Sequence, residues 1–311
     1  MRTHLSSLKG VIYHGVVAPI RNPYLPREYR QTYSRGTRLG RIVESLLDPC
    51  LKSRDKNAFR RALRPSDVFI IGHPKSGNTW LAYMLAILFC SDRQHAVTMA
   101  NVGHYIPCIH GRDADIAKHE KLPTPRFFRN EYPVHPVLYP KTIYLLRDPR
   151  AVLVSYYHMY GVVRPQAPLT LESFIDQYLV KGFLSNFEPL ERWDRQVLTW
   201  HKRARDSDRI LFVKYEDMVE DRKSVLEKVA RFINVPPSDT RMAEAVDRGS
   251  FAEMRKDEDA HGAESYLKIK DKRENFIRRG QTAGWKDEMS PKLAARIEKE
   301  FAAAMRAVGY L

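Results

Sequence analysis

Cysteine is scarce in this sequence, which has Cys50, Cys90 and Cys108 among 311 residues. Three cysteines at wide spacing argue against a disulfide framework and against a zinc site of the paired CxxC type, and they fit a reducing compartment. Long apolar runs are also missing, because the longest, Leu81–Phe89, is much shorter than the roughly 20 residues that span a bilayer. The first residues have a weak apolar stretch broken by His14, unlike a secretory signal. We therefore expect a soluble, cytoplasmic protein.

Acidic residues are in deficit: 52 Lys and Arg stand against 37 Asp and Glu, which gives a formal net charge of +15. The apolar share of 43% and the aromatic share of 11% are those of an ordinary globular protein rather than a disordered or fibrous one. The length allows one large α/β domain or two smaller ones. The basic excess would suit a nucleic acid, an anionic membrane or a small polyanionic ligand, and charge alone does not decide among the three.

The chain changes character near residue 67. Residues 1–66 are rich in proline and tyrosine and predict an N-terminal extension, whose basic residues would allow peripheral contact with an anionic membrane. Short β-branched runs predict buried parallel strands at 68–72, 142–146 and 210–214. Their alternation with helical stretches predicts a single α/β domain over 67–311, a P-loop-type parallel sheet flanked by helices on both faces.

Apolar and amphipathic stretches between these runs predict the helices. They are expected at 41–51, 78–90, 149–160, 171–181, 190–206, 224–233 and 291–308. Residues 254–284 are polar and charged and contain three glycines, so they predict a long lid loop.

A glycine-containing loop, Gly72-His-Pro-Lys-Ser-Gly-Asn-Thr79, joins the first predicted strand to the first predicted helix. Backbone N–H groups and the positive end of the helix dipole converge at such a turn, which predicts a site for a phosphate. Gly72 and Gly77 have the spacing of a Walker-type loop, but Asn78 occupies the position of the Walker lysine. The lysine stands instead at Lys75, where it can contact a bridging or leaving-group oxygen.

A magnesium site is not apparent beside this loop. Asp148 ends a predicted strand, as a Walker B aspartate does, but Arg147 and Arg150 flank it and would repel a cation. This favours a ligand whose negative charge is met by lysine and arginine.

Three segments, in order along the chain, resemble those of sulfotransferases of the cytosolic and bacterial type, which use 3′-phosphoadenosine 5′-phosphosulfate (PAPS). Pro74–Trp80 (PKSGNTW) resembles their 5′-phosphosulfate loop. Arg147–His158 (RDPRAVLVSYYH) resembles their 3′-phosphate segment, in which an arginine and a serine eight residues later bind one phosphate. Phe276–Lys286 (FIRRGQTAGWK) resembles their C-terminal signature, although Arg279 stands where lysine is usual.

The resemblance implies PAPS as cofactor, adenosine 3′,5′-bisphosphate (PAP) as its product, and no need for a metal. It also implies the residues that would bind the cofactor, with Trp80, Tyr215 and Phe251 beside the adenine. They are Pro74, Ser76, Gly77, Asn78, Thr79, Trp80, Arg147, Ser155, Tyr215, Ser250, Phe251, Met254, Phe276, Arg278, Arg279 and Gly280.

Sulfuryl transfer needs a base for the acceptor and cations around the sulfuryl oxygens and the leaving phosphate. The family's Lys-Thr-His-Leu-Pro segment, which holds its histidine base, corresponds here to Arg129–Pro133 (RNEYP). Glu131 then becomes the candidate base, and His135, four residues on, is the rival; Glu131 could also simply balance Arg129. Lys75 would stabilise the leaving phosphate, and Arg129 would neutralise sulfuryl oxygens.

Two other functions stay open at this point. A P-loop kinase or ATPase would need magnesium and ATP, and Asn78 counts against it. A basic nucleic-acid-binding protein would rest on charge alone, because the sequence has no zinc finger or RNP-like motif, so we expect no nucleic-acid partner. Within the sulfotransferase hypothesis the acceptor is a small molecule, a glycolipid or a carbohydrate, through a hydroxyl or an amine. The sequence does not give the oligomeric state.

Overall fold

The computed structural model describes residues 56–90, 96–109, 112–133, 135–163, 168–181, 191–264, 277 and 280–311. The chain forms two compact units, residues 1–61 with 186–188 and residues 62–185 with 189–311. In the first unit the description covers residues 56–61, which are helical. The predicted helix at 41–51 and most of the predicted extension lie outside the described residues. The following paragraphs concern the second unit.

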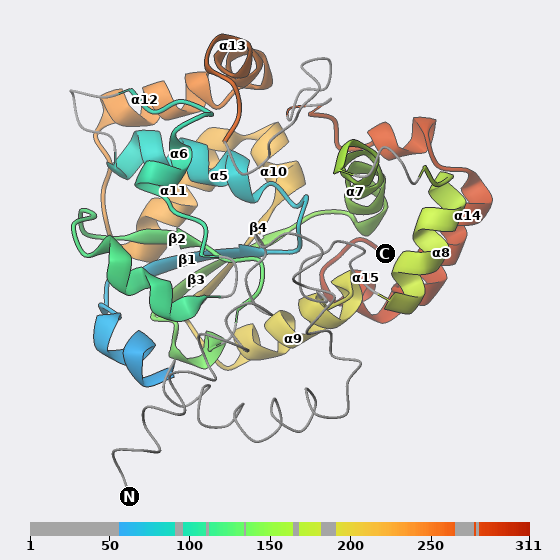
Figure 1. Ribbon diagram of the computed structural model, residues 1–311, viewed down its shortest axis with the longest axis horizontal. Helices are drawn as coiled ribbons and strands as arrows, with labels where there is room; N and C mark the ends of the chain where they lie inside the picture. The colour runs from blue at the N-terminus through green and yellow to red at the C-terminus, as the bar shows by residue number, and fades with distance from the viewer. Residues whose placement is uncertain are drawn as a thin grey trace, which may run out of the picture. The chain divides into compact units, whose positions relative to one another are not determined.

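A four-stranded parallel sheet forms the centre of this unit (Figure 1). Its strands are β1 (Val68–Gly72), β2 (Phe127–Arg129), β3 (Lys141–Leu146) and β4 (Ile210–Lys214), in the order β2-β1-β3-β4. Val68 pairs with Phe127 on one side and with Lys141 on the other. The three predicted strands are thus confirmed, and β2 is an addition that the sequence did not reveal.

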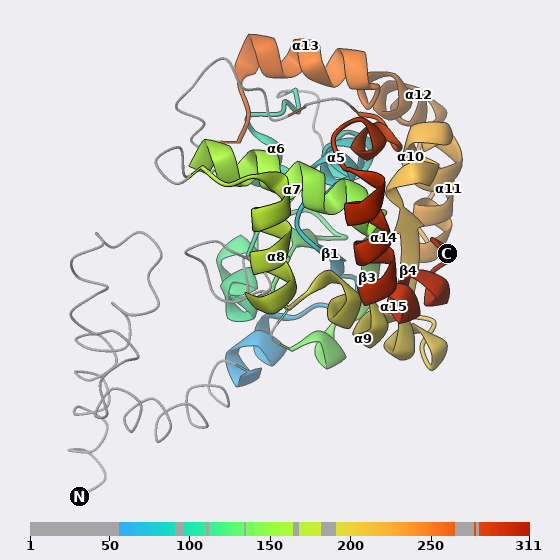
Figure 2. The same ribbon diagram turned by 90° about the vertical axis from the view of Figure 1, so that its right-hand side faces the viewer.

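Helices cover both faces of the sheet, as predicted (Figures 1 and 2). On one face, Ile70 and Val213 belong to a core cluster with residues of α5, α11 and α12. On the other face, Tyr144 stacks on Trp200 of α9 at 5.4 Å between ring centroids. The helices are α5 (Asn78–Leu85) with the π-helical turn η2 (Ala86–Cys90), α6 (Val102–Tyr105), α7 (Pro149–Val163), α8 (Leu171–Lys181), α9 (Trp193–Arg205), α10 (Tyr215–Glu220), α11 (Arg222–Ile233), α12 (Asp239–Arg248), α13 (Phe251–His261), α14 (Pro291–Glu300) and α15 (Ala302–Ala307), besides the short 3-10 segments η3 (Asp113–His119), η4 (Pro136–Leu138) and η6 (Gly284–Asp287).

The predicted lid loop over 254–284 is wrong for its first part, because residues up to 261 belong to helix α13. Ser250 caps this helix by accepting a hydrogen bond from the Glu253 N–H at 3.3 Å, and Met254 and Glu258 are buried beneath it. Its many charged residues line the exposed face of a helix rather than a loop. The single closing helix predicted for 291–308 is likewise two helices, α14 and α15, which meet at Phe301.

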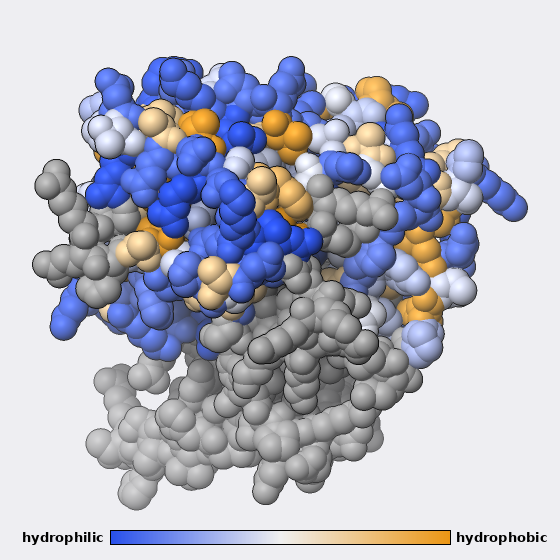
Figure 3. Space-filling model, turned by 90° about the horizontal axis from the view of Figure 1, so that it is seen from above, coloured by the Kyte–Doolittle hydropathy of each residue, from blue (hydrophilic) through white to orange (hydrophobic). Residues whose placement is uncertain are grey.

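The surface that α12 and α13 share is mostly hydrophilic, with small scattered apolar patches (Figure 3). Among the described helices, none is long and apolar enough to cross a membrane.

Candidate functional site

The predicted phosphate loop lies at the carboxyl end of β1, between Gly72 and the start of α5. Lys75 and Gly77 both adopt left-handed backbone conformations, with φ of 73° and 102°. A Cβ at Gly77 would lie 2.9 Å from a ring carbon of Tyr215, so both the conformation and the space require glycine. In the described part of the chain no side chain caps α5 at Gly77, which leaves the first backbone N–H groups of the helix to a ligand.

Ser76 is the clearest sign that this loop is built for a ligand. Its side chain is fully buried, and its Oγ has no hydrogen-bond partner among the described residues. A buried polar atom without a partner costs about 1–3 kcal/mol. Such a hydroxyl, next to the uncapped start of α5, fits an anionic oxygen, which would satisfy it.

Glu131 reaches the phosphate loop from the end of β2. The Asn78 side chain donates from Nδ2 to Glu131 Oε1 at 3.2 Å and to the Gly72 carbonyl at 3.3 Å. The Glu131 carbonyl accepts a longer hydrogen bond, of 3.4 Å, from Gln196 Nε2 of α9. One of the two candidate bases therefore stands beside the loop that the sequence predicts to bind phosphate.

The segment that carries both candidate bases is anchored by Asp113, which is fully buried. Its Oδ1 accepts from Asn130 Nδ2 at 2.8 Å and from the Tyr139 hydroxyl at 2.9 Å. Its Oδ2 accepts from the backbone N–H of His135 at 2.7 Å. Asp113, which the sequence analysis did not single out, thus fixes the position of residues on both sides of Glu131.

The ends of β3 and β4 close the other side of the loop. Arg147 Nη1 donates to the Lys75 carbonyl at 2.9 Å, and its guanidinium lies 4.0 Å from the centroid of the Tyr215 ring. Tyr215 meets Trp80 edge to face at 5.1 Å, and Trp80 Nε1 donates to the Gly249 carbonyl at 2.9 Å. Three of the predicted cofactor residues, from three separate segments, are therefore in contact.

The C-terminal signature contacts the corner between α12 and α13. Gly280 has a φ of 64°, and a Cβ there would lie 2.1 Å from a ring carbon of Phe251. Phe251 and Gly280, both predicted cofactor residues, therefore lie against each other, and the contact requires glycine. Ser250 and Met254 serve the fold as a helix cap and a core residue.

The remaining predicted site residues differ in how far they are described. Ser155 is half-buried in α7, and Lys75 and Pro74 lie in the turn of the phosphate loop. Phe276, Arg278 and Arg279 lie outside the described residues.

Arg129 and Glu264 form a buried ion pair that the sequence analysis did not foresee. Arg129 is 2% exposed, and its Nη2 and Nη1 lie 2.6 and 2.7 Å from the two carboxylate oxygens of Glu264. The residues are 135 positions apart, and Glu264 follows α13, so no local pattern could have paired them.

His73, the first residue after β1, is a second unforeseen feature. Its Nδ1 lies 3.0 Å from the Pro74 carbonyl, and its Nε2 lies 2.9 Å from the Tyr178 hydroxyl. The Pro74 carbonyl can only accept, so Nδ1 carries the proton of the neutral ring and Nε2 accepts from the Tyr178 hydroxyl. That hydroxyl in turn accepts from the Trp193 N–H at 2.9 Å. Burial lowers the pKa of His73 to about 4, which keeps the ring neutral.

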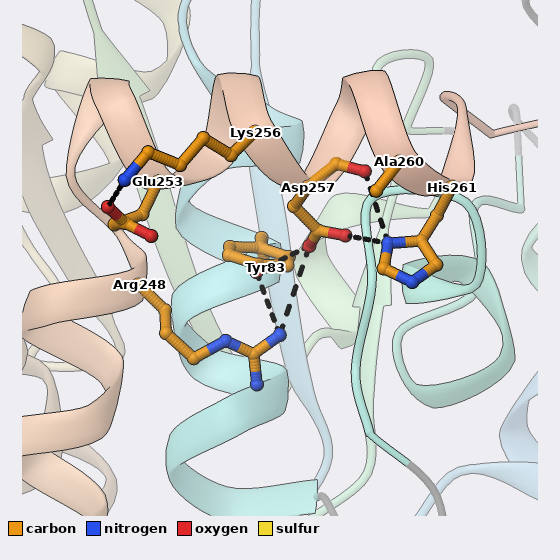
Figure 4. A pocket seen from close by; sticks show the side chains of 7 residues that line it. All are labelled: Tyr83, Arg248, Glu253, Lys256, Asp257, Ala260 and His261. Carbon is orange, nitrogen blue, oxygen red and sulfur yellow. Dashed lines mark hydrogen bonds and ion pairs between the residues drawn. The ribbon is translucent and has the colours of Figure 1, made fainter.

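A hollow of about 270 Å³ lies where α5, α12 and α13 meet (Figure 4). Lys256 and Glu253 on its rim pair with each other. The other charged groups gather around Asp257, which accepts from the Tyr83 hydroxyl at 2.6 Å and contacts His261 Nδ1 at 2.7 Å and Arg248 at 3.8 Å. Burial and the bond to Asp257 raise the pKa of Tyr83 above its ordinary value. This network braces the α12–α13 corner, and every charged side chain that lines the hollow has a partner among the described residues.

Within the described ranges, no group of three or more His, Cys, Asp or Glu side chains could hold a metal ion.

Comparisons with known proteins find similarity to sulfotransferases. The family model described as "Sulfotransferase domain" matches residues 65–309. The amine sulfotransferase of Oryctolagus cuniculus is 27% identical over 258 residues, which cover 78% of this chain and 82% of that protein. Sulfotransferase 1E1 of Homo sapiens is 25% identical over 261 residues, 78% of this chain and 85% of that protein.

Two solved structures share the fold. Mouse sulfotransferase SULT7A1 complexed with PAP has a TM-score of 0.59 at 23% identity, over 78% of this chain and 85% of that one. Retinol dehydratase in complex with androsterone and the inactive cofactor PAP has a TM-score of 0.63 at 18% identity, over 82% of this chain and 85% of that one. The predicted fold class is therefore confirmed.

Proposed function

The chain belongs to the sulfotransferase domain family over residues 65–309, and from this we propose that it transfers a sulfuryl group from PAPS to a hydroxyl or an amine, with Glu131 as the base. Its family makes it a sulfotransferase enzyme. The observation that carries the finer proposal is the 3.2 Å hydrogen bond from Asn78 Nδ2 to Glu131 Oε1. A carboxylate next to the phosphate loop supports a base at the point where the acceptor must lose its proton.

The phosphate loop fits the 5′ end of PAPS, because the buried Ser76 hydroxyl lacks a partner among the described residues. Ser76, Thr79 and the loop N–H groups would hold the 5′-phosphate, and Arg147, Ser155 and Gly280 the 3′-phosphate. When bound, PAPS supplies the sulfuryl group.

The adenine would lie among the rings at the α12–α13 corner. Trp80 and Tyr215 are already in edge-to-face contact, and Phe251 packs on Gly280 of the C-terminal signature. Aromatic faces of this kind hold a purine by stacking. The PAP-bound structures that share this fold support a nucleotide of this type.

Glu131 is favoured over His135 by its surroundings. Its Oε1 accepts from Asn78, which leaves Oε2 to take the proton of the acceptor as the acceptor attacks sulfur. His135 is held through its backbone by Asp113. Lys75, in the turn of the loop, would place positive charge at the leaving phosphate.

For the acceptor we propose a small molecule with a hydroxyl or an amine. The relatives include an amine sulfotransferase, and one neighbour structure holds androsterone, so phenols, steroid alcohols and amines belong in an acceptor screen. Carbohydrate and glycolipid acceptors, suggested by a glutamate base, belong there as well. A cytoplasmic location stays a prediction.

The first test is isothermal titration with PAP in the absence of magnesium. We expect the wild-type chain to bind PAP and Arg147→Ala to lose that binding, because a bidentate phosphate contact disappears. Binding of ATP alone, and only with magnesium, would contradict the proposal and favour a P-loop kinase.

The second test separates the two candidate bases. Replacing the carboxylate in Glu131→Gln should lower kcat by about 10²–10⁴-fold without changing PAP affinity. His135→Gln, the matched control, should stay close to wild type in the same assay with labelled PAPS. The reverse pattern would assign the base to His135.

A further inference from the structure

Arg129 stands where the family has a lysine in its base segment, so the resemblance implies a contact with the sulfuryl oxygens. Its surroundings differ from that expectation. The guanidinium is almost completely buried and forms a two-pronged ion pair with Glu264, at 2.6 and 2.7 Å. Its charge is thereby already compensated by a carboxylate of the protein.

The fold is shaped around this pair. Arg129 Nε donates to the Ile106 carbonyl at 3.1 Å, just past the end of α6. A Cβ at Gly103 of α6 would lie 2.4 Å from Glu264 Oε1, so the helix leaves room for the carboxylate only because it has glycine there. Glu264 itself is 7% exposed. Three elements, α6, β2 and the turn after α13, therefore meet at the pair.

The pair also touches the phosphate loop through Thr79. Arg129 Nη1 donates to Thr79 Oγ1 at 3.3 Å, and Thr79 is the second residue of α5. A hydroxyl has one proton and two lone pairs. When one lone pair accepts from Arg129, the hydroxyl proton points away from the guanidinium and can be donated to a phosphate oxygen.

We propose that Arg129 and Glu264 act together as positioning residues, which orient the Thr79 hydroxyl toward the 5′-phosphate of the cofactor, and that Arg129 does not contact the sulfuryl group. This inference rests on the proposed function. It assigns Glu264 a role in cofactor binding, although that residue lies far along the chain from the phosphate loop.

PAP tests the inference because it has the phosphates of PAPS but no sulfuryl group. We expect Arg129→Gln and Glu264→Gln each to weaken PAP binding by about 3- to 10-fold, the effect of losing one oriented hydrogen bond. The double variant should be no weaker than either single one, because the two residues act as one unit. Unchanged PAP affinity in Arg129→Gln, with slower turnover of PAPS, would overturn the inference and return Arg129 to the sulfuryl group.

Breaking a buried ion pair can also impair folding, so a second variant leaves the charges in place. Gly103→Ala pushes the Glu264 carboxylate aside and should weaken PAP binding in the same way. Its matched control is Gly161→Ala in α7, where a Cβ meets nothing within 4 Å. Equal PAP affinity in the two alanine variants would overturn the inference. A wild-type chain that does not bind PAP would refute the proposed function as well, which distinguishes the two failures.

Discussion

Strand β2 has a buried arginine at each end, and the two make nearly the same interaction. Arg126, which precedes the strand, is 1% exposed and donates from Nε and Nη2 to Asp67 at 2.8 and 2.6 Å. Arg129, which ends it, is 2% exposed and pairs with Glu264 at 2.6 and 2.7 Å. Burial and hydrogen-bond geometry do not tell them apart.

The positions of the two arginines relative to the sheet distinguish them. Arg126 also donates to the carbonyls of Ala62 and Ile116, and Asp67 directly precedes β1, so this pair lies at the amino end of the parallel strands. Arg129 lies at the carboxyl end, next to Thr79 of the phosphate loop. Ligands of open α/β sheets bind outside the carboxyl ends of the strands. The Arg126–Asp67 pair therefore stabilises the fold, while the position of the Arg129–Glu264 pair also allows the proposed role in ligand binding.

The largest expected effect is on stability, from Arg126→Gln. The variant leaves the Asp67 carboxylate buried without its charged partner, which should lower the free energy of unfolding by about 3–5 kcal/mol. Urea unfolding measures the loss. The comparison predicts that the folded fraction keeps wild-type affinity for PAP, unlike Arg129→Gln. Weaker PAP binding in Arg126→Gln would show that the end of the strand does not decide the role of the pair.

A second expected effect concerns His73, which also lies at the carboxyl end of the sheet. Burial lowers its pKa to about 4 in the folded chain, whereas an unfolded chain has about 6.5. The unfolded state therefore binds the proton more readily, so stability is full above pH ~6.5 and falls as the pH drops toward 4, by about 3 kcal/mol in all.

Unfolding measured between pH 4 and 7.5 checks this dependence. His73→Gln should be less stable at neutral pH but should show a flatter profile, because the titrating group is gone. The exposed His104→Gln is the control and should keep the wild-type slope. A profile of His73→Gln as steep as that of the wild type would mean that carboxylates elsewhere account for the acid sensitivity.

Local patterns were sufficient for most of the fold. β1, β3 and β4 are short β-branched runs, each followed by a helical stretch, and such patterns need no knowledge of distant residues. The sequence analysis missed β2 because the strand has only three residues. One of them is an arginine that is buried through its ion pair with a distant residue. Helix α13 was predicted as a loop because its polar sequence has few buried positions and because its N-cap, Ser250, was assigned to the cofactor.

The candidate site likewise has parts that local sequence predicts and parts that it does not. The turn between β1 and α5 was predictable because its glycines, lysine and threonine all lie within residues 72–79. The contact of Asn78 with Glu131 spans 53 positions, and that of His73 with Tyr178 spans 105. Such pairings arise from tertiary packing, and the residue types alone do not specify them. Only the family resemblance brought Glu131 into the hypothesis.

The smallest expected effect tests whether burial accounts for the strength of the two arginine ion pairs. Lys223 and Glu227 of α11 form an ion pair at 3.8 Å, with side chains 64% and 42% exposed. Water screens both charges, so Lys223→Ala should change the free energy of unfolding by less than about 0.5 kcal/mol and should leave PAP binding unchanged. Urea unfolding of the single and double alanine variants measures the coupling between the two residues. A coupling as large as that of Arg126 with Asp67 would show that solvent exposure does not set the strength of these pairs.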